Sequence, residues 1–403
     1  MNTRPLAGVR VLDFGHTVMG PTAGLILADL GADVIKVEPV GRGDPTRGLK
    51  GFGTGYFGFF NRNKRSIALD LKQPEGQAVA LRLLAGADVL IENFAPGTMD
   101  RLGLGESVVR AANPALVYAS LKGFLAGPYE TRLALDEVVQ MMAGLAYMTG
   151  PPGQPLRAGA SVVDITGGLF AVVGILAALR VRDAGGAAAG VSSALFEACV
   201  FLMGQHLAYA SQIDEAVPPM PARRSSWAIY DVFRLSGGEA MFVGITTDAH
   251  WQRFCAAVGR ADLAADATLL TNNQRVAARD RLMPLVAGIF ETLDGDAAAA
   301  LCERARIPFA PIARPEDLFE DPHLAATGGL LETTMPNGTR TKLPRLPLTL
   351  DGAGFDLRHQ PPLLGSATEA VLREAGYEAA QIDALVAAGV IALAQPSPET
   401  PAQ

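Results

Sequence analysis

Short apolar segments alternate with amphipathic segments over residues 1–125. The pattern predicts strands at residues 9–14, 33–38, 66–71, 88–94 and 115–124, with helices at 20–32 and 74–87. Short apolar strands that are separated by helices are typical of a parallel, doubly wound sheet buried on both faces. The chain is therefore expected to have an α/β fold.

The loops after these strands are the first candidates for a ligand site, because ligands of doubly wound sheets bind beyond the carboxyl ends of the strands. The candidate loops are residues 14–20, 38–48, 92–101 and 122–137. The first loop reads GHTVMGPTAG and lacks the GxGxxG fingerprint. Binding of NAD or FAD in the usual manner is therefore disfavoured.

A second α/β unit is predicted in the other half of the chain. Residues 182–192 are expected to form a flexible loop, and the segment 216–226, rich in Pro and Arg, a domain linker. Beyond it the pattern predicts a hairpin at 230–246, helices at 248–260, 273–291 and 296–305, an extended proline-rich segment at 334–350, and helices at 366–376 and 379–388. The end of the final stretch, IALAQPSPETPAQ, is expected to be frayed.

Composition narrows the classes of function. The 403 residues are 49% hydrophobic and carry a net charge of −7 without a basic tract, which predicts a large core and argues against a nucleic-acid partner. Cys199, Cys255 and Cys302 lack CxxC spacing and the five histidines lack HExxH spacing, so we predict no metal site and no disulfide framework. The N-terminus has no signal-peptide pattern, and the longest apolar run, residues 167–179, is too short to span a bilayer. We expect a cytoplasmic protein that does not act at a membrane.

Asp164 is the most informative single residue. Val162 and Val163 before it have the pattern of a buried strand, and Gly167 opens the apolar run, which predicts a helix. A carboxylate between two buried elements is costly to desolvate unless something uses or satisfies it. Asp and Thr ahead of a helix are also ordinary N-cap residues. The local pattern therefore leaves two interpretations: Asp164 or Thr166 caps the helix, or Asp164 serves chemistry.

Seven segments along almost the whole chain carry a resemblance to a known family. They are LAGVRVLDFGHTVMGP, LADLGADVIKVEPVGRGDPTRG, NRNKRSIALDLKQPEG, DVLIENFAPGTMDRLGL, NPALVYASLKGF, DITGGLFAVVGILAALRVR and PPLLGSATEAVLREAGY. In this order they resemble the family III CoA-transferases, the group of formyl-CoA:oxalate and carnitine CoA-transferases and α-methylacyl-CoA racemases. Each segment alone is weakly specific, whereas seven in the right order are strongly specific.

The resemblance implies an architecture that the spacing alone does not. It comprises a Rossmann-like large domain, a smaller α/β domain and an interlocked homodimer, in which two chains thread through each other. The large domain is expected to contain residues 1–200 and the C-terminal segment 340–403, and the small domain residues 226–325.

The resemblance also implies a reaction and the residues that perform it. Asp164 matches an aspartate that attacks an acyl-CoA thioester and passes through a mixed anhydride to an aspartyl-CoA intermediate. Coenzyme A enters as the substrate thioester, and no metal or redox cofactor is required. Gly167 and Gly168 are expected to let a thioester oxygen approach backbone N–H donors. Asp136 matches an acid beside the catalytic aspartate; on its own it would be interpreted as an acid at a helix start.

Residues that match the CoA site come from several strand-end loops. They are His16, Thr17, Val18 and Met19 along the pantetheine arm, Leu69 to Lys72 at the adenine, Asn93 and Phe94 at the nucleotide, Arg101 at a phosphate, and Lys122 in the next loop. The fork of an arginine suits phosphate because it donates two hydrogen bonds. Without the family, Arg101 and Lys122 would be interpreted as solvated surface charges.

Three functions are compatible with these motifs: CoA transfer between carboxylic acids, racemisation of α-methylacyl-CoA, and CoA binding without catalysis. Racemases pair an aspartate with a histidine. Leu135 stands where that histidine would precede Asp136, which favours transfer. The presence of Asp164 argues against a non-catalytic homologue.

Two features bear on the transferred acid. The glycine-rich closing loop of the oxalate enzyme has no counterpart at 215–240, where Arg223, Arg224 and Trp227 stand instead. Arg157, seven residues before Asp164, either pairs with a second carboxylate of the substrate or lies on the surface. We expect small carboxylic acids as partners, in particular a C4–C6 dicarboxylate such as succinate, itaconate, mesaconate or citramalate, with succinyl-CoA as the donor.

Overall fold

The computed structural model describes residues 4–223 and 225–394. They form two compact units, one of Met1–Pro221 with Ala325–Gln403 and one of Ala222–Leu324. Arg224 and the end of the C-terminal stretch that was expected to be frayed lie outside the described residues.

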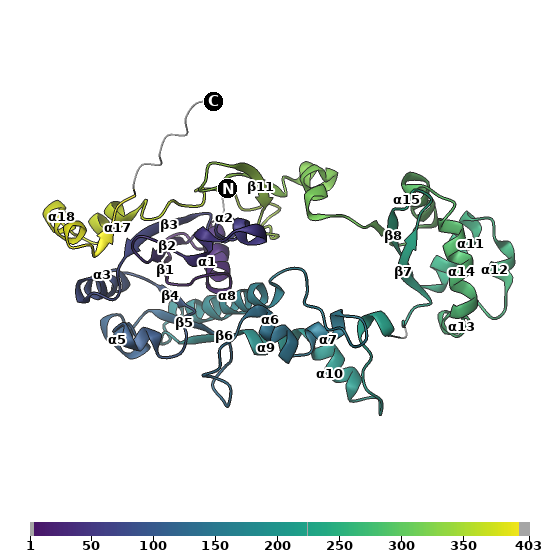
Figure 1. Ribbon diagram of the computed structural model, residues 1–403, viewed down its shortest axis with the longest axis horizontal. Coiled ribbons are helices and arrows are strands. Elements are labelled where there is room, and N and C mark those ends of the chain that lie inside the picture. Colours follow the sequence, from purple (N-terminus) through teal and green to yellow (C-terminus); the bar gives the residue numbers. More distant parts are fainter. Residues whose placement is uncertain (1–3, 224, 395–403) are drawn as a thin grey trace. The chain divides into compact units, whose positions relative to one another are not determined.

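A seven-stranded sheet forms the centre of the larger unit (Figure 1). Its strands are β1 (Arg10–Asp13), β2 (Asp33–Glu38), β3 (Lys64–Leu69), β4 (Val89–Glu92), β5 (Val117–Lys122), β6 (Val191–Ala194) and β12 (Ile391–Ala392). The order is β12-β3-β2-β1-β4-β5-β6, and all pairings are parallel except that of β12 with β3. The prediction of a mainly parallel α/β sheet is confirmed. The strand order reverses between β1 and β4, which is where doubly wound sheets open a crevice for ligands.

Helices cover both faces of this sheet, and successive strand residues point to opposite sides. Val11 packs in a cluster with Leu27 and Ile175 of α1 and α8, whereas Leu12 packs in a second cluster with Leu83 of α3. The helices of the unit are α1 (Met19–Asp29), α2 (Tyr56–Phe60), α3 (Pro74–Leu84), α4 (Thr98–Arg101), α5 (Glu106–Ala112), α6 (Asp136–Met142), α7 (Leu145–Thr149), α8 (Val162–Asp183), α9 (Leu195–Leu202), α10 (Gly204–Ala210), α17 (Thr368–Glu374) and α18 (Ala379–Ala387). Burial on both faces explains why apolar residues predominate at the centres of these strands.

Four strands of the larger unit were not predicted from the sequence. The expected loop at 182–192 ends inside β6, which pairs with β5 at the edge of the sheet. The expected extended segment at 334–350 contains β11 (Arg340–Pro344), which forms an antiparallel hairpin with β10 (Leu330–Thr334). β12 is two residues long. These strands are short or polar and therefore lack the apolar pattern on which the prediction relied.

The prediction of a strand at Val162 and Val163 was wrong, because both residues belong to the first turn of α8. Asp164 is consequently the third residue of a helix that spans 22 residues, longer than the expected 167–179. This helix is long and apolar enough to cross a membrane, with a mean hydropathy of 2.2 over its most apolar window. It packs on α1, α9, β5 and β6, and its inner side chains belong to the core of the unit. We therefore describe it as a core helix.

The smaller unit has its own antiparallel sheet and core. Its strands are β7 (Ile229–Arg234), β8 (Ala240–Ile245) and β9 (Phe309–Pro311), and its helices are α11 (Asp248–Ala257), α12 (Ala261–Ala265), α13 (Asn272–Ala277), α14 (Arg279–Phe290) and α15 (Gly295–Ala305). The hairpin expected at 230–246 is β7 and β8. The single helix expected at 273–291 is two helices, α13 and α14, since the backbone leaves helical geometry at Ala278.

Candidate active site

The loops after β1 and β4 are bonded to each other at the point where the strand order reverses. The backbone N–H of His16 donates to Oδ1 of Asn93 at 2.8 Å, and Nδ2 of Asn93 donates to the carbonyl of His16 at 2.9 Å. The rings of His16 and Phe94 lie 5.5 Å apart. The structure therefore brings three of the residues that match the CoA site together at the carboxyl edge of the sheet.

Thr17 has an unusual backbone conformation in this loop. Its φ of 67° lies in the left-handed region, which is strained for a β-branched residue and costs about 1–3 kcal/mol. Nδ1 of His16 lies 2.9 Å from Oγ1 of Thr17. Among the described residues, the backbone N–H groups of residues 17–20 have no acceptor, as is normal at a helix start. Together with the α1 dipole they make the loop a donor surface for negative charge.

The starts of α1 and α8 are packed against each other through two glycines. A side chain at Gly167 would lie 2.6 Å from Cε of Met19, and one at Gly168 would lie 2.8 Å from Cβ of Thr22. Both glycines are inside α8, where their N–H groups donate to the helix itself. Their own N–H groups are therefore used within the helix, and the expected approach of a thioester oxygen to backbone donors at these glycines stays a prediction. The two glycines allow close approach of the helices, which brings the first turns of α8, the helix that carries Asp164, against Met19 and Thr22.

Asp136, not Asp164 or Thr166, caps α8. One carboxylate oxygen of Asp136 accepts the N–H groups of Val163 and Asp164 at 2.9 and 3.1 Å. The other accepts Nε2 of Gln140 at 2.6 Å. Thr166 instead donates its hydroxyl to the carbonyl of residue 162, within the helix. Both oxygens of Asp136 are thus engaged in positioning the helix start.

The carboxylate of Asp164 has no hydrogen-bond partner among the described residues, although the residue is half-buried. Burial, with a contribution from the nearby charge of Asp136, raises the pKa of Asp164 to about 7, and Arg157 opposes this rise. An unpaired carboxylate with a raised pKa is a better nucleophile than an ordinary aspartate and is substantially ionised near neutral pH.

Arg157 lies toward this pair of acids and is not a free surface residue. Its guanidinium is 3.7 Å from carboxylate oxygens of Asp136 and Glu137. It also donates to the carbonyls of Ala158 and Ala160 at 3.0 and 3.1 Å. The two carboxylate contacts are longer than good hydrogen bonds, so Arg157 can reorient toward an incoming anion.

The two cations expected near phosphate differ in their contacts. The ammonium of Lys122 donates to both oxygens of Glu92 and to the carbonyl of Phe94, all within 2.7 Å. Its three protons are therefore used in holding the loop of Asn93 and Phe94, and a direct contact of Lys122 with CoA stays a prediction. Arg101, in contrast, is exposed and donates only to Thr98 among the described residues, so its guanidinium remains available.

The segment Leu69 to Lys72, which is expected at the adenine, has one buried end and one exposed end. The side chain of Leu69 is buried in the core cluster of β3, so it cannot contact a nucleotide. Lys72 is exposed just after the carboxyl end of β3, where its backbone N–H donates to Asp70 at 3.0 Å. Only the exposed end of this stretch faces solvent on the ligand side of the sheet.

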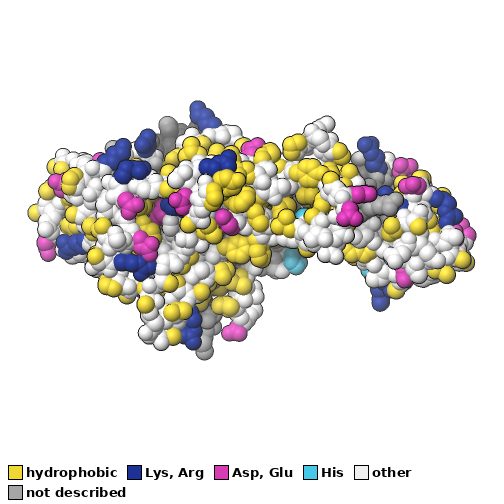
Figure 2. Space-filling view, turned by 90° about the horizontal axis from the view of Figure 1, so that it is seen from below, with side chains coloured by type: hydrophobic (Ala, Val, Ile, Leu, Met, Phe, Trp, Pro, Cys, Tyr) yellow, Lys and Arg dark blue, Asp and Glu magenta, His cyan; other side chains and the backbone are white. Residues whose placement is uncertain are grey.

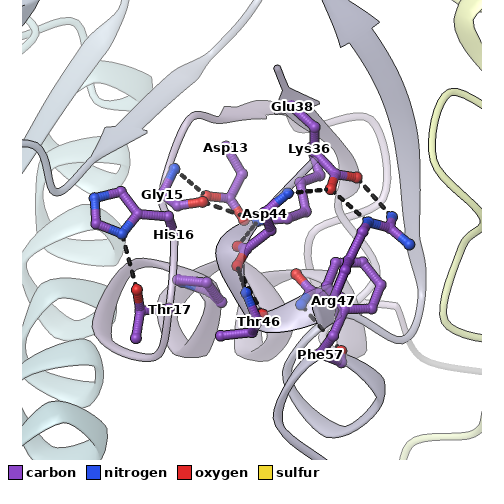
Figure 3. A network of polar contacts seen from close by, with 12 residues as sticks. Asp13, Gly15, His16, Thr17, Lys36, Glu38, Asp44, Thr46, Arg47 and Phe57 are labelled. Carbon is purple, nitrogen blue, oxygen red and sulfur yellow. Dashed lines mark hydrogen bonds and ion pairs between the residues drawn. The ribbon is translucent and has the colours of Figure 1, made fainter. Parts of the chain in front are cut away.

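Sequence reasoning missed a network of buried ion pairs below the 14–20 loop (Figure 3). Lys36 pairs with Asp44 at 2.9 Å and Lys64 with Asp13 at 2.8 Å, and all four side chains are buried. Burial lowers the pKa of Lys64 to about 8, against the opposing effect of Asp13. Lysines inside the apolar strands β2 and β3 were the available signal, because a fully buried lysine requires a partner.

A second group that was missed is aromatic. Tyr56 and Ile165 both pack against the cluster of Val18 and its neighbours, and the hydroxyl of Tyr56 lies 3.4 Å from Oγ of Ser161, immediately before α8. Phe52 lies against Tyr56 with ring centroids 5.8 Å apart and is largely exposed. Aromatic side chains therefore lie close to the start of the helix that carries Asp164.

Of the residues that replace the closing loop of the oxalate enzyme, Trp227 lies in the smaller unit. Its ring is 5.0 Å from that of Tyr230. Arg223 and Arg279 line a cavity of about 620 Å³ in that unit. Neither observation connects these residues to Asp164.

Comparisons with known proteins identify relatives along nearly the whole chain. The model of CoA-transferase family III matches residues 6–368. An acyl-CoA transferase of Fusarium pseudograminearum is 36% identical over 96% of this chain and 88% of its own length, and a succinate–glutarate CoA-transferase of Agrobacterium fabrum is 34% identical over 92% and 95%. The crystal structure of a CAIB/BAIF family protein from Brucella suis covers 93% of this chain and 100% of its own, with 31% identity and a TM-score of 0.82.

The family match covers nearly the whole chain and includes the segments that build the site at the carboxyl edge of the sheet. The chain belongs to CoA-transferase family III and is an enzyme with CoA-transferase activity.

Proposed function

We propose that the enzyme transfers coenzyme A from an acyl-CoA thioester to a carboxylic acid through a covalent intermediate on Asp164. The observation that carries this proposal is the half-buried carboxylate of Asp164, which has no hydrogen-bond partner among the described residues and a raised pKa. The first turns of its helix pack against the start of α1, where the N–H groups of residues 17–20 have no acceptor among the described residues. We propose that these N–H groups stabilise the negative charge that develops when Asp164 acts as the nucleophile.

The reaction begins when a carboxylate oxygen of Asp164 attacks the thioester carbonyl carbon. The C–S bond breaks, CoA leaves as a thiolate, and the acyl group forms a mixed anhydride with Asp164. The thiolate then attacks the aspartyl carbonyl, which releases the donor acid as a carboxylate and leaves an aspartyl-CoA thioester. An incoming carboxylate reverses these steps, so no net proton transfer and no metal or redox group is required.

Backbone donors of the 16–19 loop suit the negative oxygen that forms in each addition step. The N–H groups of residues 17–20 have no acceptor among the described residues, and Met19 is packed on Gly167, one turn after Asp164. Donors that are fixed before the reaction stabilise an oxyanion without reorganisation. In this proposal they replace the glycines of α8 as the source of that stabilisation.

The acid is proposed to be a C4–C6 dicarboxylate, with succinyl-CoA as the donor. Arg157 supplies a cation close to Asp164 that has only long contacts with Asp136 and Glu137. A guanidinium can form two parallel hydrogen bonds with a distal carboxylate, and the aromatic side chains of Tyr56 and Phe52 suit the methylene or branched part of the acid. The relative from Agrobacterium fabrum is named for succinate and glutarate, which are also dicarboxylates.

The covalent step is tested by replacing Asp164 with Asn, which is nearly isosteric but cannot act as the nucleophile. Turnover should fall by several orders of magnitude in the folded variant. Wild-type enzyme that is mixed with acyl-CoA and then hydroxylamine should gain a hydroxamate mass on the peptide that contains Asp164. Retained turnover in the Asn variant would remove Asp164 from the mechanism.

We further propose that the enzyme is a cytoplasmic, interlocked homodimer. Large apolar side chains remain exposed on several helices of the larger unit, including Phe201 at 71% and Val173 at 63%. The face seen from below also shows apolar side chains over much of its area (Figure 2). Apolar exposure of this extent usually marks an interface. A stable, folded monomer in equilibrium sedimentation at micromolar concentration would be incompatible with this assembly.

A further inference from the structure

The buried ion pairs of Lys36 with Asp44 and of Lys64 with Asp13 take no part in the proposed chemistry, yet they converge on its loop (Figure 3). The ammonium of Lys36 donates to the carbonyl of Gly15 at 2.8 Å and pairs with Asp44 at 2.9 Å. The backbone N–H of Gly15 donates to Oδ1 of Asp13 at 2.8 Å. The peptide groups on both sides of Gly15 are therefore held by buried charges.

The four charges form two separate ion pairs, so one pair can be removed without the other. The other oxygen of Asp13 accepts from Lys64 at 2.8 Å. Lys64 also donates to the carbonyl of Pro21 and to Asn61 at 2.9 and 3.0 Å. Removing the charges of Lys36 and Asp44 together leaves the pair of Asp13 and Lys64 intact and strands no single charge.

Two residues after Gly15, the chain adopts the strained conformation of Thr17. A strained residue persists only where its surroundings determine the backbone on both sides. Asn93 holds His16 directly before Thr17, and Lys36 holds Gly15 one residue further back. Releasing the Gly15 carbonyl would allow Thr17 to relax toward negative φ, and the N–H groups of residues 17–20 would turn with it.

We propose that Lys36 is a positioning residue for CoA transfer: its buried ammonium fixes the β1–α1 loop so that the N–H groups after His16 remain aligned beside Asp164. This inference rests on the proposed function. The side chain of Lys36 is buried and cannot touch the substrate. In this inference it aligns the N–H donors that act on the reacting oxygen. Misalignment of such donors lowers the rate of the chemical step more than it weakens binding.

The test compares two double variants that each neutralise one buried ion pair. Lys36→Met with Asp44→Asn removes the pair below the loop, and the Asn can still accept the N–H of Thr46 at the start of η1 (Pro45–Gly48). The matched control, Arg62→Met with Asp29→Asn, removes an equally buried pair at 2.7 Å, at the other end of α1. Folding is checked by circular dichroism and melting temperature, and kcat and KM for the acyl-CoA are measured for each protein.

We expect kcat of the Lys36/Asp44 variant to fall about thirtyfold or more while KM for the acyl-CoA changes less than about threefold. The control should keep kcat within about twofold at a similar melting temperature. Equal losses in both variants, an unchanged kcat, or a rise in KM alone would each overturn the positioning role. Failure of the proposed function has a different signature, which is turnover by the Asp164→Asn variant.

Discussion

Asp164 should make the folded enzyme less stable at neutral pH than it would be with a neutral residue there. Its pKa is about 7 in the folded protein, against an ordinary value of 3.8. Between these values the folded state binds more protons than the unfolded state, so stability falls as pH rises through this window. This loss of folding stability is absent below about pH 4 and complete above about pH 7. The substitution Asp164→Asn removes the ionising group and therefore the loss of stability.

The magnitude follows from the size of the shift. About three pKa units at about 1.4 kcal/mol each give an upper bound of about 4 kcal/mol. Asp164 is only half-buried, and solvent screening reduces this to about 1–3 kcal/mol. The Asn variant should therefore be more stable than wild type at pH 8 by that amount, with a gain that shrinks progressively toward pH 4.

The assay is reversible guanidinium unfolding at several pH values from 4.5 to 8.5, at fixed protein concentration. Asp383→Asn serves as the control for net charge, because Asp383 is exposed on α18 in the same unit. The control should not change the pH dependence of the free energy of unfolding. If Asp164→Asn were neutral or destabilising at pH 8, or if its gain did not vary with pH, the environment derived for Asp164 would be wrong.

Three further variants test the neighbours of Asp164. Asp136→Asn keeps an oxygen acceptor for the N–H groups at the start of α8 but removes a charge that raises the pKa of Asp164. The acidic limb of the profile of kcat/KM against pH should therefore move down by about one pH unit. An unmoved limb would contradict this coupling. Arg157→Ala should reduce kcat/KM for dicarboxylates about thirtyfold or more, because a desolvated charge pair contributes about 2 kcal/mol. The value of kcat/KM for monocarboxylates should change little. Equal losses for both classes of acid would refute the dicarboxylate proposal. Arg101→Ala should raise KM for acyl-CoA about tenfold and leave kcat within about twofold, and an unchanged KM would place this exposed guanidinium outside the nucleotide site.

The sequence predicts the sheet well because its signal is local. Strands such as 88–94 are mainly apolar segments between turns, and their carboxyl ends identify the candidate ligand loops without knowledge of tertiary contacts. The local pattern does not show the environment of a side chain where a distant partner decides it. Lys122 has the pattern of a surface cation, yet Glu92 and the carbonyl of Phe94 use all its protons. Val162 has the pattern of a strand, but the carboxylate of Asp136 caps a helix there.

The site combines two unfavourable features that the rest of the fold must maintain. Asp164 is held where its ionisation is disfavoured, and Thr17 is held in a strained conformation. In both cases the supporting group is a buried charge on another element: Asp136 caps the helix that carries Asp164, and Lys36 holds the loop that carries Thr17. Neither support is adjacent in sequence to the residue that it positions. Substitutions at Asp136 and Lys36 should therefore change rate and pH dependence more than their distance from the substrate would indicate.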